Sequence, residues 1–180
     1  MVNLVKIVVI VALTLLSITS CSTKPSLQQY FVAHESKDNF TIIDIPKSIL
    51  GFTEESFSSK QKQAYNSINK VQLLAYPIAS GDAAVYDAEK QAVKNLLKAS
   101  EYTTVGRMST GGGKVMITYL GEADAIDEMI VFGYKKDVGL GIARILGDGM
   151  NTEAIASLYD ALKSSKPDDS KIKEYLELFQ

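Results

Sequence analysis

The spacing of apolar residues changes near residue 100. Before residue 100, strand-like and helical segments alternate, and after it the apolar residues follow a period of two. In the first part, β-branched runs that stop near Pro46 and Pro77 are typical of strands, while polar capping residues precede segments whose apolar positions lie three or four apart. The pattern predicts helices over 27–34 and 58–70, strands over 40–45 and 71–76, and a longer helix that begins at Asp82.

The helix after Asp82 has the most regular apolar stripe in the chain. Residues at such intervals lie on one side of a helix and are usually buried against a neighbouring layer. The stripe comprises Val85, Tyr86, Ala88, Ala92, Val93, Leu96 and Leu97. We expect the opposite side of this helix to face solvent, lined by Lys90, Lys94 and Lys98.

Alternating apolar and polar positions dominate the second part of the chain. They predict strands over 102–109, 114–120, 126–134 and 138–146. Short glycine-rich or acidic turns separate these strands, and a turn that short joins antiparallel neighbours. The second part therefore predicts an antiparallel meander.

The C-terminal residues return to helical spacing. A helix that begins at Asn151 or Thr152 would place Ile155, Leu158, Tyr159 and Leu162 on one face. A polar break follows, and the last residues have amphipathic spacing at Ile172, Tyr175, Leu176 and Phe179. Together the segments predict an α+β fold: a mainly antiparallel sheet with helices packed on one face, after an N-terminal lipoprotein signal peptide.

The first twenty residues have the layout of a secretory signal. Lys6 precedes an apolar run over 7–16, and Ile18, Thr19 and Ser20 lead into Cys21, the only cysteine. This order is typical of a bacterial lipoprotein signal, in which cleavage before the cysteine is followed by acylation of its thiol. A plain cleavable signal and an uncleaved anchor helix are the alternatives. The predicted organisation is a signal peptide over 1–20, the lipidated Cys21 with a tether over 21–26, one domain over 27–163 and a tail over 164–180.

Charge and composition limit the classes of partner that the chain could bind. Without the signal, the chain has 18 basic and 21 acidic residues, a net charge of −3, and no basic footprint for nucleic acid. Acyl chains on Cys21 would hold the domain on a membrane without a spanning helix. Because no run of acidic residues follows Cys21, we expect the periplasmic face of the outer membrane rather than the cell surface.

Several segments that resemble catalytic or binding motifs lack residues that those motifs require. The Gly111-Gly112-Gly113-Lys114 segment lacks the hydroxyl residue and first glycine of a phosphate loop, and 139–144 lacks the third glycine of a dinucleotide fingerprint. The acidic cluster over 122–128 lacks the ligand spacing of a calcium loop. His34 is the only histidine, so metal and triad chemistry are not indicated. We expect no cofactor and no enzyme, although carboxylate-pair chemistry is not eliminated by the sequence.

One part of the predicted sheet is rich in small and aromatic residues. Gly139, Gly141 and Ala143 alternate on the last strand, so another backbone, a helix or a ligand can come close there. A candidate interaction surface follows from these residues and neighbouring aromatic ones; it comprises Tyr119, Phe132, Tyr134, Gly139 and Gly141. The alternative is that these residues are ordinary core.

Several segments resemble a known family. They are 25–32, 40–46 with Asp44-Ile45-Pro46, 119–121, 125–128, 132–133 and 144–151. In this order they resemble the Bacteroidota lipoproteins catalogued as domain of unknown function 4252, over about residues 25–163. The resemblance implies a small α+β envelope protein without established enzymatic activity, often encoded near extracytoplasmic-function sigma-factor systems. Two functions remain open: a non-catalytic module that binds an envelope protein, and a small-molecule or lipid binder.

Overall fold

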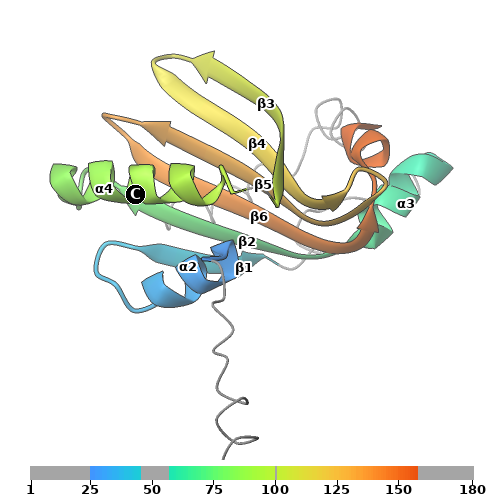
Figure 1. Ribbon diagram of the computed structural model, residues 1–180, viewed down its shortest axis with the longest axis horizontal. Helices are drawn as coiled ribbons and strands as arrows, with labels where there is room; N and C mark the ends of the chain where they lie inside the picture. The colour runs from blue at the N-terminus through green and yellow to red at the C-terminus, as the bar shows by residue number, and fades with distance from the viewer. Residues whose placement is uncertain (1–24, 46–56, 100, 158–180) are drawn as a thin grey trace, which may run out of the picture.

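The computed structural model describes residues 25–45, 57–99 and 101–157 (Figure 1). In chain order the elements are α2 Leu27–His34, β1 Thr41–Ile45, α3 Ser59–Ser67, β2 Ile68–Pro77, α4 Ala83–Leu96, β3 Tyr102–Thr110, β4 Gly113–Glu122, β5 Ala125–Lys135 and β6 Gly139–Met150. A further helix covers 152–157. The signal peptide, Cys21, the second half of the predicted last helix and the C-terminal tail lie outside the described residues.

Six antiparallel strands form one sheet in the order β1-β2-β6-β5-β4-β3. The predicted meander is confirmed over β3 to β6, and β6 then pairs with β2. The β3–β4 turn uses Gly111 and Gly112 with φ of 54° and 82°, a left-handed pair that suits the twist of a two-residue hairpin. The α+β fold with a mainly antiparallel sheet is therefore as predicted.

Local capping explains where the helices begin. Ser26 and Ser58 each form a capping box with the glutamine three residues later, at the starts of α2 and α3. The Asp82 carboxylate accepts hydrogen bonds from the backbone N–H groups of residues 84 and 85 at the start of α4. The prediction for α3 was too long, because Ile68 already adopts extended backbone and pairs with Gly147 of β6.

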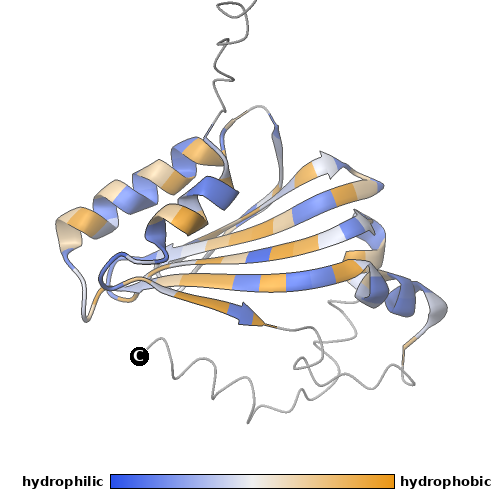
Figure 2. Cartoon of the chain, turned by 90° about the horizontal axis from the view of Figure 1, so that it is seen from below, coloured by the Kyte–Doolittle hydropathy of each residue, from blue (hydrophilic) through white to orange (hydrophobic). Residues whose placement is uncertain are grey.

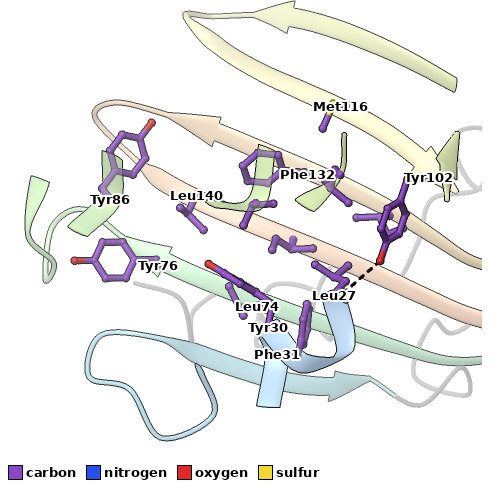
Figure 3. Close-up of a cluster of buried hydrophobic side chains, with 14 residues drawn as sticks. Leu27, Tyr30, Phe31, Leu74, Tyr76, Tyr86, Tyr102, Met116, Phe132 and Leu140 are labelled. Atoms are coloured by element: carbon purple, nitrogen blue, oxygen red, sulfur yellow. Dashed lines mark hydrogen bonds between the residues drawn. The ribbon is translucent and has the colours of Figure 1, made fainter. Parts of the chain in front are cut away.

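The larger hydrophobic core lies between the sheet and the helices α2 and α4, which cover the same face (Figures 1 and 3). Its buried residues are Leu27, Tyr30, Phe31, Leu74, Tyr76, Tyr86, Val93, Leu97, Tyr102, Met116, Ile130, Phe132, Leu140 and Ile142. The backbone N–H of Leu27 donates to the Tyr102 hydroxyl at 3.3 Å, the dashed line in Figure 3. This contact fixes the start of α2 against the start of β3.

A second core closes one end of the opposite face. Its buried residues come from α3, the strands and the helix over 152–157: Phe57, Ala64, Tyr65, Ile68, Ile126, Met129, Met150 and Ala154. Figure 2 shows α2 and α4 on one side of the sheet and α3 beyond the far ends of the strands. Two helices therefore cover one face, and two short ones cap an end of the other.

The side of α4 that faces the sheet is narrower than the predicted stripe. Tyr86, Val93 and Leu97 are buried and Leu96 is half-buried, whereas Val85, Ala88 and Ala92 are exposed. The lysines expected to face solvent do so only in part. The ammonium groups of Lys90 and Lys94 lie 4.7 Å and 4.8 Å from the ring centroids of Tyr86 and Tyr134. Glu89, a polar residue of α4, instead faces α2 and contacts Tyr30 and His34.

Candidate functional site

The face of the sheet opposite α2 and α4 presents two rows of apolar side chains that cross β2, β6, β5 and β4. Strand register defines the aliphatic row as Leu73, Ala143, Val131 and Ile117. It defines the glycine row, two residues away on each strand, as Ala75, Gly141, Gly133 and Val115. All eight residues are half-buried, and neither row contains a charged or polar side chain. No described helix packs on the glycine row, and in the aliphatic row Ile117 borders the second core. We call the two rows together the uncovered face.

The glycine row forms the floor of an open groove of about 370 Å³ whose lining is mainly apolar. A Cβ built on Gly141 would have the Leu74 carbonyl oxygen as its nearest neighbour, at 3.7 Å, and one on Gly133 would have Val115 Cγ2, at 3.9 Å. Both are ordinary contacts, so the described residues leave room for side chains that these positions lack. Lys114 and Lys135 also line the groove.

The five residues predicted as one interaction surface are not brought together. Gly141 lies on the uncovered face, and Tyr119 packs against the second core on the same side of the sheet. Phe132, in contrast, is fully buried beneath the helices, and Tyr134 packs beside it, with ring centroids 5.1 Å apart. The correction follows from strand alternation, because Phe132 and Tyr134 occupy the other parity of β5 from Gly133. For Phe132 the ordinary-core alternative holds.

Gly139 has a different role from Gly141. Its φ is 127°, and a Cβ there would lie 2.1 Å from the Tyr76 carbonyl oxygen. The turn into β6 thus requires glycine for the chain's own backbone. Of these two glycines, only Gly141 leaves free space on the sheet surface.

The sequence did not identify the partner of His34, which is Glu89 on α4. One Glu89 oxygen lies 2.9 Å from His34 Nε2 and 3.2 Å from Lys37 Nζ, and the other accepts from the Tyr30 hydroxyl at 3.0 Å. His34 Nδ1 is 2.7 Å from the Tyr30 carbonyl oxygen, which can only accept, so Nδ1 carries a proton. His34 is buried, stacks on Tyr30 and meets Phe40 edge-on.

Electrostatics agree with a structural role for this cluster. Burial alone would raise the pKa of Glu89, but hydrogen bonds from His34, Lys37 and Tyr30 outweigh it and hold the pKa below its usual value. Burial, together with the Glu89 charge, raises the pKa of the Tyr30 hydroxyl, which therefore remains a donor. The carboxylate is fully engaged in holding α2 against α4. We call this cluster the clamp, because it holds α2 against α4.

A second polar group lies under α2 on the helix-covered face. Arg144 forms a two-pronged pair with Glu128, at 2.6 Å and 3.0 Å, and both side chains are about 5% exposed. A third guanidinium nitrogen of Arg144 donates to the side-chain oxygens of Gln28 and Gln72. The buried guanidinium of Arg144 on β6 thereby links this strand to β5, β2 and α2.

Basic residues gather between α4 and the β3–β4 hairpin. A groove of about 260 Å³ there is lined by Lys94, Lys98, Arg107 and Lys114, with Tyr134 and Met116 among its apolar residues. Within the described part of the chain, none of these four cations forms an ion pair with a carboxylate. We call this the cationic groove.

A family profile described as Domain of unknown function (DUF4252) matches residues 33–158. The chain belongs to this family. The DUF4252 region contains the six strands, α3, α4 and both rows of the uncovered face, while most of α2 precedes it. No curated protein matches the chain, and neither does any solved structure.

Two further observations concern the described residues of this DUF4252 protein. No group of three or more histidine, cysteine or acidic side chains in them is arranged to hold a metal ion. None of their helices has the length and apolar character needed to cross a membrane.

Proposed function

We propose that this protein is a non-catalytic interaction module of the cell envelope, anchored through an acylated Cys21, whose uncovered face binds an amphipathic helix of another envelope protein. One observation carries the proposal: two adjacent rows on this face contain no polar side chain. An antiparallel sheet with one solvated face normally has polar residues there. Contiguous apolar surface of this kind is typical of binding sites.

The dimensions of the groove favour a helix as the occupant. The glycine row crosses four strands, a width of about 14 Å at the usual strand spacing. A helix of nine residues has about the same length. Gly141 and Gly133 let the axis of such a helix approach the sheet more closely than larger residues would. Lys114, which lines the groove, favours a partner with acidic residues beside its apolar stripe, whereas Lys135 at the same groove already pairs with Asp137.

The anchor and setting complete the proposal. Acyl chains on Cys21 would place the domain at a membrane surface, on the periplasmic face of the outer membrane, with only a few residues before α2 begins at Leu27. The family resemblance adds the context of a sigma-factor-controlled envelope response, in which binding would report or transmit a state of the envelope.

Site-specific crosslinking in cells tests the interaction. A photoreactive amino acid at Ala143, in the aliphatic row, should capture a defined partner protein. Gly141→Val should abolish capture without unfolding the domain, because its side chain would fill the groove floor. Gly106→Val on the edge strand β3 is the matched control, since a Cβ there meets no atom within 4 Å, and it should leave capture intact. Equal capture by all three proteins would refute the proposal.

The cationic groove supports a second candidate, binding of an anionic lipid headgroup. Four cations for which the described residues show no ion pair lie beside Tyr134 and Met116, and they offer charge and apolar contact to a phosphate that carries acyl chains. The mature chain with Cys21→Ser should then sediment with phosphatidylglycerol vesicles and not with phosphatidylcholine vesicles. Replacing Lys98 and Arg107 by Gln should weaken that binding about tenfold or more. The same charge change at Lys60 and Lys62 on α3 should not, and an equal loss in both variants would exclude the groove.

A further inference from the structure

We propose that the C-terminal segment 171–179 docks on the glycine row of its own chain and must leave before a partner helix can bind. The inference rests on the proposed function only in treating the uncovered face as a binding face. It assigns the face an intramolecular occupant and makes the tail a regulator of access.

The sequence of the segment fits the groove. Ile172, Tyr175, Leu176 and Phe179 recur at intervals of three, one and three, which places them on one side of a helix. Glu174 and Glu177 fall on the other side, which faces solvent when the apolar side lies on the groove. Nine residues of helix measure about 13 Å, close to the width of the glycine row.

The chain leaves the described part of the fold on the correct side of the sheet. Ile155 packs against the second core, together with Val71 and Ile145 of the strands. Val71 lies four positions before Ala75 and Ile145 four positions after Gly141, about 13 Å along the same face. The carbonyl oxygen of Ser157 accepts from Gln61 of α3 at that end, and 23 residues follow it.

The polar break before the segment is long enough for the segment to reach the glycine row. Residues 164–170 alone span up to about 23 Å when extended, more than the distance required. A segment on so short a connection has a local concentration of about millimolar order. The segment can therefore cover the apolar groove even if its intrinsic affinity is low. A partner that buries both rows would displace it.

Thiol labelling measures the docking directly. In the mature chain with Cys21→Ser, an Ala75→Cys substitution places a single thiol in the glycine row. We expect slow reaction with a maleimide when the tail is intact. Leu176→Asp should speed the reaction about tenfold, because a charge on the apolar side opposes docking. Leu178→Asp, the same change beside the apolar stripe rather than in it, should leave the rate within about twofold.

The other outcomes overturn the inference. Equal labelling rates in the intact, Leu176→Asp and Leu178→Asp chains would show that the tail does not cover the groove. Protection that disappears on dilution would assign the cover to a second copy of the chain. Failure of partner capture in cells, with labelling as expected, would instead reject the proposed function and leave the docked tail standing.

Discussion

Two glycines on β6, two residues apart, should respond in opposite ways to the same substitution. Gly139→Ala puts a methyl group 2.1 Å from a backbone oxygen that cannot rotate away, at a φ of 127° that side chains rarely adopt. The strain of such a backbone conformation costs about 1 to 3 kcal/mol, and overpacking costs about as much again. We expect Gly139→Ala to lower the free energy of unfolding by about 2 to 6 kcal/mol.

Gly141→Ala meets only an ordinary contact, with the nearest heavy atom at 3.7 Å. Replacing glycine by alanine at a compatible position restricts the unfolded chain and stabilises a protein by about 0.4 to 1 kcal/mol. We therefore expect an unchanged or slightly higher free energy of unfolding. The difference between the two variants should be at least about 2 kcal/mol.

Urea titration followed by far-UV circular dichroism measures both values in one experiment. The denaturant dependence of the free energy should stay the same in the two variants, which confirms that the midpoint shift reports stability. A loss for Gly141→Ala as large as that for Gly139→Ala would refute the reasoning. It would mean that Gly141 is closely packed and that the groove is part of the core.

Three other predictions follow from the buried groups and the anchor. Arg144→Met should cost about 3 to 5 kcal/mol in urea titration, because it leaves the Glu128 carboxylate buried without its cation, and a double variant with Glu128→Leu should recover much of the loss. Since the pKa of Glu89 is lowered in the folded protein, its stabilisation is complete above the ordinary pKa and is lost as the pH falls through the folded value. Glu89→Gln should accordingly flatten the acid side of the stability profile, and an unchanged slope would contradict the clamp. Cys21→Ser should abolish fatty-acid labelling and release the protein from membranes; labelling that persists would reject acylation at this residue.

Sequence patterns carried much information about the elements and some about their surfaces. Capping residues and period predicted α2, α4 and the four-strand meander, because these signals act over a few neighbouring residues. The continuous apolar run Met129-Ile130-Val131-Phe132 also indicated a strand with two apolar faces. That signal could have identified the uncovered face, whereas the aromatic residues chosen from the sequence lie on both sides of the sheet: Tyr119 on one, Phe132 and Tyr134 on the other.

By itself, the sequence determined the local elements, the α+β class, the family and the candidate anchor at Cys21, since each depends on residues close together in the chain. Only the tertiary structure decided which charges meet and which face remains uncovered. Glu89 lies 55 residues from His34, and Glu128 lies 16 from Arg144 across paired strands. Strand order and helix rotation set such pairs, through the burial of all the elements together, and no short stretch of sequence encodes that arrangement.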